Sequence, residues 1–450
     1  MYLPITKRTR IEKLLLAVLL ISLLFSCHKV EIPKPPLPQD ESATVVYDWY
    51  KFIALVQRPA NPQPAVIQNM RNFGFIGVGL YEAVRNGNIG AESLAGSLYQ
   101  MPAMPQTDTW SQYLWSESAN AALASMFKLF LVLTDANKAS IDSMEMANYT
   151  RFSASTPEDV LQRSQAFGRS IATAIYDWSL TDGFNLSSVG YVPPPVTPGS
   201  WVPTPLAYAS PVGPFLADSR PFLEYSLTDL APPLPFPFSE DTSSLFYKAV
   251  KEVYDIGIHL TDEQKATANW WADAGGPNVG IPAPHHVLSI ITWVQEDQHA
   301  NLWKAAEVYA KTGIALKDGG INTFRSKYHY NLIRPITYVR RNIDTAWLSY
   351  LPTPPYPEYT SGLVGFYAPY IQALIRAYGD IPVNDNAYNW RGLPARKFTS
   401  LSALLNEAAV SRIYGGLHYR FTQEISIRFG KDLGNEISNI RLTPLNHLHP

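Results

Sequence analysis

Residues 354–375, PPYPEYTSGLVGFYAPYIQALI, join a proline-rich approach, a small polar turn and an apolar segment. The apolar residues after Thr360-Ser361-Gly362 recur at helical spacing and predict a helix over about 360–379. A hydroxyl and a residue without a side chain would then lie at a helix N-terminus, where unpaired N–H groups and the positive end of the dipole attract an anion. Taken alone, the segment is better explained by ordinary capping through Thr360 or Ser361.

A second segment, KYHYNLIRP, carries two cations. Lys327 and Arg334 are seven residues apart, close to two helical turns, so we expect both on one face of a helix that Pro335 ends. Two cations near a helix C-terminus could also be surface charges that the dipole favours.

A third segment, SRIYGGLHYRFT, places Arg412 six residues before His418. On a continuous helix these two side chains would not face each other. The Gly415-Gly416 pair between them predicts a break, so that Arg412 ends one helix, His418 begins the next stretch, and the two side chains converge.

Helical periodicity runs through most of the chain, whereas strand alternation is nearly absent, so the sequence predicts an all-α fold of helical bundles with long Pro-rich loops. We expect an N-terminal helical region over 44–182, a Pro-rich excursion over 183–240 and a C-terminal helical domain over 241–450. The excursion could cover a cleft or link two bundles. Helices are expected at about 44–57, 64–85, 110–131, 135–151, 156–181, 243–257, 261–273, 284–311, 314–333, 360–379, 400–414 and 418–436.

The N-terminus has the pattern of an export signal. Four basic residues precede an apolar run at 14–25 that is too short to span a bilayer. The run ends in LFSC at 24–27, which resembles the lipobox of bacterial lipoproteins and implies cleavage after residue 26 and lipid on Cys27, followed by a Pro-rich tether over 27–43. An ordinary signal peptide that ends near a cysteine is the alternative. We expect a lipid-anchored protein of the cell envelope, on the periplasmic or outer-membrane face.

The composition argues against several classes of partner. The 36 basic and 38 acidic residues give a formal net charge of -2, and no stretch concentrates Lys and Arg as nucleic-acid binding requires. Charged residues make up 16% and aromatic residues 12% of the chain, which fits a globular protein rather than a disordered one. Cys27 is the one cysteine in the sequence, so the chain forms no intramolecular disulfide.

Together the three segments follow the order K-x6-R-P, S-G at a helix start, and S-R-x5-H. They supply three cations, a hydroxyl, backbone donors and an imidazole, the groups that hold a tetrahedral oxyanion. This order resembles the type 2 phosphatidic acid phosphatase and vanadium-dependent haloperoxidase superfamily, especially its soluble chloroperoxidase-like branch, over about residues 260–430. The resemblance implies a helical fold of the vanadium chloroperoxidase or acid phosphatase type.

The resemblance also implies roles for single residues. His418 would bond the vanadium in a haloperoxidase, or act as the nucleophile in a phosphatase. By the same resemblance, the stretch NWWADAGG implies that Asp273 is an aspartate that supports the residues in contact with the oxyanion and does not touch the oxyanion itself. The residues expected to contact the vanadate or phosphate are Lys327, Arg334, Ser361, Gly362 and Arg412.

Two positions depart from the family pattern. Leu363 stands where the family has an acid–base histidine, and Thr422 stands where an aspartate often orients the third motif's histidine. Removing an acid–base group typically costs about 10²–10⁴-fold in rate. The expectation is an intact binding shell with depleted proton-transfer groups. Another histidine could replace the missing one, the enzyme could be slow, or the protein could bind without turnover; the candidate replacements are His285, His286 and His329.

Three functions therefore remain open. The first is a haloperoxidase with vanadate as cofactor, and halide and peroxide as substrates. The second is a phosphomonoesterase that uses His418 as nucleophile. The third is a ligand-binding surface lipoprotein, permitted by the 11 Trp and 26 Tyr residues, for which the three motifs would be coincidence.

Overall fold

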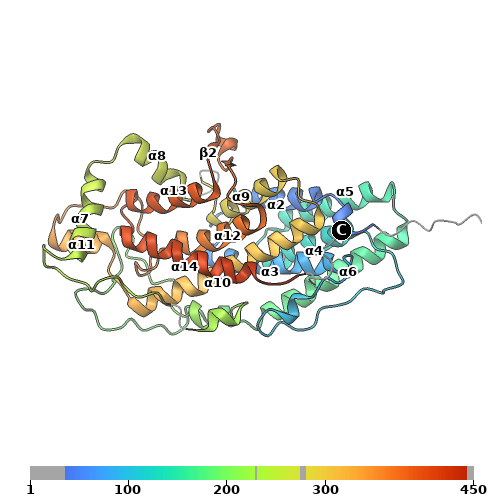
Figure 1. Ribbon diagram of the computed structural model, residues 1–450, viewed down its shortest axis with the longest axis horizontal. Helices are drawn as coiled ribbons and strands as arrows, with labels where there is room; N and C mark the ends of the chain where they lie inside the picture. Colours follow the sequence, from blue (N-terminus) through green and yellow to red (C-terminus); the bar gives the residue numbers. More distant parts are fainter. Residues whose placement is uncertain (1–35, 229–230, 274–279, 443–450) are drawn as a thin grey trace, which may run out of the picture. The chain divides into compact units, whose positions relative to one another are not determined.

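The computed structural model describes residues 36–228, 231–273 and 280–442. The predicted signal peptide and Cys27 lie outside these ranges and stay predictions. Within them the chain is mostly helical, so the predicted all-α class is confirmed (Figure 1). The α-helices are α2 (Thr44–Gln57), α3 (Val66–Arg85), α4 (Trp115–Phe130), α5 (Asp135–Ser153), α6 (Glu158–Ser179), α7 (Leu245–Ile258), α8 (Asp262–Trp270), α9 (Ala283–Asp297), α10 (Leu302–Tyr330), α11 (Pro335–Asn342), α12 (Gly362–Tyr378), α13 (Leu401–Tyr414) and α14 (Arg420–Ser438).

Short elements complete the described part of the chain. Two three-residue strands, β1 (Val383–Asp385) and β2 (Arg396–Phe398), pair antiparallel, with Val383 opposite Phe398. The 3₁₀ helices are η1 (Pro38–Asp40), η2 (Leu94–Gly96), η3 (Phe184–Leu186), η4 (Leu216–Asp218), η5 (Glu224–Leu227) and η6 (Asn389–Arg391).

The long helix α10 is the centre of the packing. It lies against α3 on one side and against α12 on another, and α12 also packs against α14. A glycine permits each close approach: a Cβ on Gly77 of α3 would come within 2.2 Å of the Tyr309 carbonyl oxygen, and one on Gly365 of α12 would overlap the Thr323 hydroxyl. Helices α4 and α6 pack on each other beyond α3. The helix that carries Lys327 is therefore held closely on two sides, by its backbone against α3 and by the Thr323 side chain against α12.

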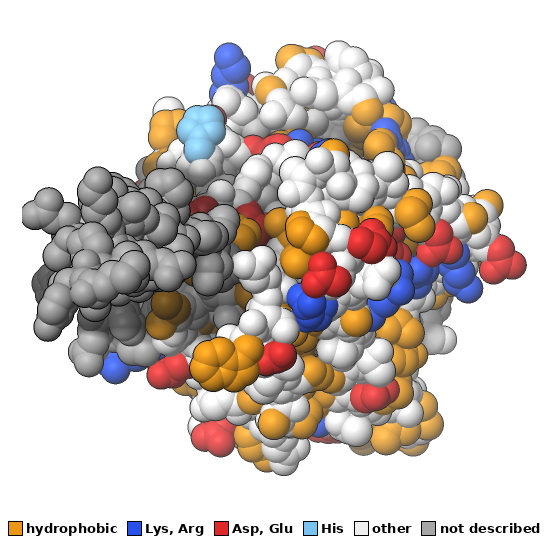
Figure 2. Space-filling model, turned by 90° about the vertical axis from the view of Figure 1, so that its right-hand side faces the viewer, with side chains coloured by type: hydrophobic (Ala, Val, Ile, Leu, Met, Phe, Trp, Pro, Cys, Tyr) orange, Lys and Arg blue, Asp and Glu red, His pale blue; other side chains and the backbone are white. Residues whose placement is uncertain are grey.

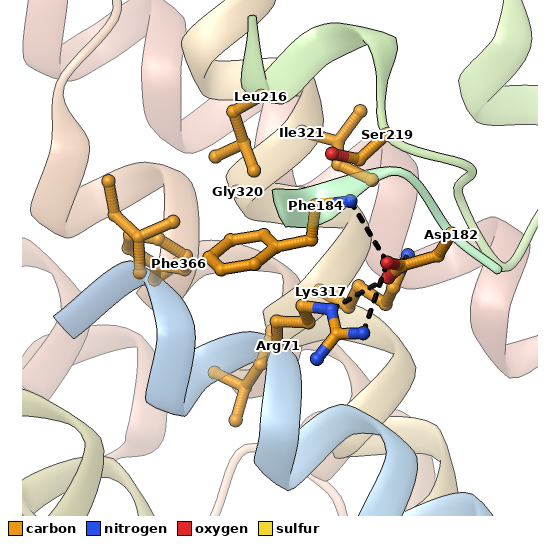
Figure 3. Close-up of a pocket in the computed structure, with 11 residues that line it drawn as sticks. Arg71, Asp182, Phe184, Leu216, Ser219, Lys317, Gly320, Ile321 and Phe366 are labelled. Atoms are coloured by element: carbon orange, nitrogen blue, oxygen red, sulfur yellow. Dashed lines mark hydrogen bonds and ion pairs between the residues drawn. The ribbon is translucent and has the colours of Figure 1, made fainter. Parts of the chain in front are cut away.

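Buried charged residues attach the Pro-rich excursion to helices α3 and α10 (Figure 3). Asp182, at its start, accepts hydrogen bonds from Arg71 of α3 at 2.7 Å and 3.0 Å, and Lys317 of α10 lies 3.6 Å away. Asp318, also on α10, accepts from the backbone N–H groups of Phe222 and Leu223 at 2.7 Å and 2.9 Å. Because these carboxylates are buried and paired, the excursion has fixed attachment points on α3 and α10.

Two sequence-based helix predictions are wrong. The single helix expected over 284–311 is two helices, because α9 ends at Asp297 and Asn301 caps a new helix by accepting from the Lys304 N–H at 2.9 Å. The helix expected over 314–333 ends at Tyr330, where Asn331 adopts a left-handed conformation with φ 44°. Pro335 begins α11 and does not simply end a helix, since proline is favoured in the first helical turn.

Among the described residues, no helix combines the length and the apolar character needed to cross a membrane. On the face in Figure 2, basic and acidic side chains lie next to each other among uncharged ones. Pairs such as Arg163–Asp159 and Lys128–Asp142 join neighbouring charges at the surface. The face in Figure 2 carries side chains of both charges, as expected from the nearly equal numbers of basic and acidic residues in the sequence.

Candidate functional site

The sequence motifs meet at the wall of a cleft of about 270 Å³. The cleft wall includes Gly362 and Leu363 at the start of α12, Arg412 near the end of α13, and His418 just before α14. Lys327 and Arg334 lie behind this wall and are fully buried. We call the six residues the anion cradle: Lys327, Arg334, Ser361, Gly362, Arg412 and His418.

Lys327 comes from the last turn of α10, whereas Arg334 precedes α11, so the two cations are not on one helix as the spacing predicted. They still converge, because Lys327 Nζ and Arg334 Cζ lie 4.8 Å and 5.3 Å from the ring centroid of Tyr356. Lys327 Nζ donates to the carbonyl oxygens of Pro357 (3.0 Å), Glu358 (3.1 Å) and Thr360. Its charge thus holds the segment before α12 in place. Burial and the nearby Arg334 charge lower the pKa of Lys327 well below its usual value.

Arg334 and His418 are in direct contact. Arg334 Nη1 lies 3.2 Å from His418 Nε2 and 2.9 Å from the Leu417 carbonyl oxygen, and Arg334 Nε donates to the Tyr356 carbonyl oxygen at 3.0 Å. Because a guanidinium only donates, His418 Nε2 must accept and carries no proton. Burial, followed by the charges of the three cradle cations, lowers the pKa of His418 well below its usual range. The imidazole is therefore neutral, with the Nε2 lone pair on the cradle side.

The opposite nitrogen of His418 is held by Glu358, which the sequence reasoning did not select. His418 Nδ1 donates to Glu358 Oε1 at 2.7 Å, and the Tyr419 N–H donates to the same oxygen at 3.2 Å. Thr422 donates to Glu358 Oε2 at 3.0 Å. A hydrogen bond at one ring nitrogen orients an imidazole and makes the other a better ligand. The family pattern has an orienting aspartate where this chain has Thr422. Glu358, in the segment before α12, supplies that carboxylate instead, so the expectation that His418 has no orienting carboxylate is wrong.

The remaining cradle residues present unpartnered donors. The turn before α12 holds the buried hydroxyls of Thr360 and Ser361, and neither has a hydrogen-bond partner in the described part of the chain. Ser361 is the N-cap of α12, yet its side chain makes no capping bond, so simple capping does not explain it. Arg334 Nη2 and Arg412 Nε are also buried and unpartnered within that part. Arg412 is held by Nη1, which donates to the Trp271 carbonyl oxygen at 2.8 Å.

These observations fit a tetrahedral oxyanion. Orphaned buried donors are costly unless a ligand or water satisfies them. Here they belong to two guanidinium groups and two hydroxyls, and the first N–H groups of α12 lack intrahelical acceptors as at every helix start. Gly362 leaves the approach open, since a Cβ there would lie 3.3 Å from the Tyr356 hydroxyl. The residues present would suit vanadate or phosphate equally well; that they bind either stays a prediction.

The predicted replacement histidines do not line the cleft. His285 is buried beside Gln57, with 2.6 Å between Nε2 and Oε1, and burial lowers its pKa to about 3. His329 is exposed on α10. His286 is fully buried but lies 2.5 Å from Asp273, which does line the cleft together with Leu363. Asp273 thus lies on the cleft wall itself rather than behind the direct contacts.

Comparisons with known proteins agree with this geometry. A family model described as the VCPO second helical-bundle domain matches residues 307–446, the part of the chain that contains the whole cradle. No curated protein matches the chain.

Solved structures extend the likeness over most of the chain. The crystal structure of the first bacterial vanadium-dependent iodoperoxidase matches at a TM-score of 0.79 and 28% identity, covering 90% of this chain and 97% of that one. A holo-type bacterial vanadium-dependent chloroperoxidase matches at 0.62 and 18%, covering 83% and 91%, and an apo-type one at 0.61 and 19%, covering 82% and 92%. The two chloroperoxidase matches show the shared fold alone. Family model and structures are consistent with the type 2 phosphatidic acid phosphatase and vanadium-dependent haloperoxidase superfamily that the sequence motifs indicated, and the chain has a mostly helical, vanadium haloperoxidase-like fold.

Proposed function

We propose that this chain is a vanadium-dependent haloperoxidase, which binds vanadate in the anion cradle and oxidises halide with hydrogen peroxide. The observation that carries the proposal is the arrangement around His418: a neutral imidazole, fixed by Glu358, whose unprotonated Nε2 lies against Arg334 Nη1, in a cradle that also holds buried, unpartnered donors. The 28% identical structure named as an iodoperoxidase makes iodide the first halide to test.

Each cradle residue has a separate task in this proposal. His418 Nε2 would bond the vanadium, and Arg334 Nη2 and Arg412 Nε would donate to its oxygens in a site with little water, where such bonds are strong. Lys327 adds positive charge and holds the turn that carries Ser361. Bound vanadate would supply a Lewis-acidic centre for the activation of peroxide.

A phosphomonoesterase is the second candidate, because a neutral histidine with an unprotonated Nε2 also suits a nucleophile that attacks phosphorus. One assay separates the candidates. The purified full-length chain is tested with iodide, bromide and hydrogen peroxide, with and without orthovanadate, and with p-nitrophenyl phosphate in vanadate-free buffer. We expect halide oxidation that requires orthovanadate. Phosphate ester hydrolysis without halide oxidation would favour the phosphatase, and vanadate binding with neither activity would indicate a binding protein.

Glu358 gives a sharper test of the cradle. In Glu358→Gln the side chain keeps its size but loses the charge that holds His418 Nδ1–H, so orthovanadate affinity should fall about 10–100-fold, as is typical when a ligand-orienting carboxylate is replaced. Affinity is measured by equilibrium dialysis.

The matched control is Glu252→Gln, which removes a carboxylate that pairs with Arg420 at the surface, and it should bind as the unmodified chain does. Unchanged affinity in Glu358→Gln would show that His418 needs no carboxylate to bind the anion.

Attachment to the cell envelope through lipid on Cys27 is part of the proposal. It would be seen as membrane-bound protein that Cys27→Ser releases.

A further inference from the structure

Asp273, His286 and Asp385 form a buried cluster beside the cleft, which we call the Asp–His–Asp cluster. His286 Nδ1 lies 2.5 Å from Asp273 Oδ1, and His286 Nε2 lies 2.9 Å from Asp385 Oδ2. The exposed fractions of these three side chains are 3% or less. Trp271 stacks on the His286 ring, with centroids 5.1 Å apart and planes 16° apart. The imidazole is thus fixed between two carboxylates and one indole.

The hydrogen bonds determine the protonation of the cluster. Both nitrogens of His286 face carboxylate oxygens, which accept, so both nitrogens carry protons and the ring is a cation. Burial would lower the pKa of His286, but the charges of Asp273 and Asp385 outweigh burial and raise it to about 10. Asp385 is further fixed by donors from Trp270 Nε1 at 2.7 Å and the Ala387 N–H at 3.0 Å. One cation and two anions leave the cluster with a net charge of -1.

Asp273 is the member of the cluster that reaches the cleft. Its residue follows α8 in a left-handed conformation with φ 48°, and it lines the cleft with Leu363, Arg412 and His418. Its second oxygen accepts from the Tyr367 hydroxyl of α12 at 3.1 Å. Burial raises the pKa of Tyr367 well above its usual value, so that hydroxyl stays protonated. The charged and titratable groups around Asp273 are His286, Asp385, Tyr367, Tyr370, Tyr388 and Arg412.

The cleft needs such a group because position 363 is leucine. His418 has its lone pair on the cradle side, Arg412 stays charged, and burial raises the pKa of Tyr356. Among the described residues of the cleft wall, Asp273 is then the carboxylate placed where it could accept and return a proton. His286 bonds Asp273, and Asp385 bonds the other nitrogen of His286, so the two residues orient Asp273 as hydrogen-bonded partners orient a catalytic acid or base.

We propose that Asp273 is the proton-handling residue of this cleft and takes the place of the histidine absent at 363, with His286 and Asp385 as positioning residues. The inference rests on the proposed haloperoxidase function. The overall reaction is X⁻ + H₂O₂ + H⁺ → HOX + H₂O: the O–O bond breaks, an X–O bond forms, and halide gives two electrons to the peroxide. The Asp273 carboxylate accepts a proton from hydrogen peroxide and returns it to the oxygen that leaves as water. The proton consumed overall comes from solvent.

The first test combines two substitutions. Asp273→Asn should lower kcat by about 10²–10⁴-fold, the usual contribution of an acid–base group, while orthovanadate affinity should not fall, because the cradle is untouched and a nearby negative charge is removed. Adding Leu363→His to Asp273→Asn should restore kcat at least about tenfold, because an imidazole then lies at the family's acid–base position. Asp262→Asn, at an exposed site on α8, is the matched control. Full activity in Asp273→Asn, or equal loss of activity and vanadate affinity, would overturn the inference.

A second test needs no turnover. An anion bound beside a carboxylate favours the protonated form of that carboxylate, so orthovanadate binding should be coupled to proton uptake. Calorimetry in two buffers of different ionisation enthalpy measures this uptake, which should fall in Asp273→Asn; unchanged uptake would contradict the role. If the chain oxidises no halide, the proposed function fails, and calorimetry still decides the role of Asp273. If Asp273→Asn does not fold, Tyr367→Phe replaces it, and the measured proton uptake should differ from that of the unmodified chain because the carboxylate loses a donor.

Discussion

Replacing His418 by alanine should lower vanadate-dependent halide oxidation by about 10³-fold or more, because it removes the neutral nitrogen donor of the cradle. The loss of orthovanadate affinity should be at least about 10–100-fold, the cost of disturbing a metal-ligating histidine. Phosphate, held in the free protein by hydrogen bonds and charge alone, should lose less than about tenfold, because Arg334, Arg412 and Ser361 remain. The ratio of the two affinities is read from competition between the anions in equilibrium dialysis.

The comparison of anions separates a bond to vanadium from general electrostatics. If vanadate and phosphate weaken equally in His418→Ala, the histidine only shapes the cradle and makes no special bond to vanadium. His329→Ala is the control, since His329 is exposed on the same helix as Lys327 and contacts the ring of Tyr330. It should leave both affinities and the halide oxidation rate unchanged. Circular dichroism of each variant establishes that the helices are intact.

Much of the cradle was predictable because its residues lie at fixed spacings around helix ends. The break at Gly415-Gly416 is present: Arg412 lies in the last turn of α13, Gly416 has φ 74°, and His418 precedes α14. The helix start at Ser361-Gly362 is also where the sequence placed it. Local rules of capping and glycine conformation suffice for such features, since they depend on neighbours in the chain.

The parts that could not be predicted depend on contacts between distant segments. Glu358 lies 60 positions before His418, and no local rule states that its carboxylate will reach the imidazole. The pairing of His286 with Asp385 joins residues 99 positions apart through a short hairpin that shows no clear strand pattern. The sequence nevertheless contains a feature that marks each residue. Glu358 is a carboxylate between prolines and the Thr-Ser-Gly turn, and His286 belongs to a histidine pair at a helix start.

Lys327 and Arg334 converge as predicted, although the single helix predicted to carry both is absent. Their spacing of seven predicted one helical face, but α10 ends at Tyr330 and the chain turns at Asn331. The two cations nevertheless meet over Tyr356, because Lys327 and Arg334 both bond carbonyl groups of the segment 356–360. Hydrogen bonding to one loop, and not helical periodicity, brings them together.

Replacing His286 by glutamine should lower the free energy of unfolding by about 3–5 kcal/mol at pH 7, because two buried carboxylates lose their cation. The effect should depend on pH with a defined sign. The pKa of His286 is raised from 6.5 in the unfolded chain to about 10 in the folded one. Its stabilisation is therefore complete below about pH 6.5 and is lost as pH rises toward 10, on the order of 1.4 kcal/mol per pH unit.

Urea unfolding at pH 7, 8 and 9 measures the difference between the unmodified chain and His286→Gln, which should shrink steadily over this range. The difference isolates His286 from Lys317, whose pKa is lowered to about 8 by burial and which makes both proteins more stable as pH rises above 8. His259→Gln, at the exposed end of α7, should match the unmodified chain at every pH. A difference that stays constant from pH 7 to 9 would mean that His286 is neutral in the fold. The ring could then donate a hydrogen bond to only one of the two carboxylates, Asp273 or Asp385.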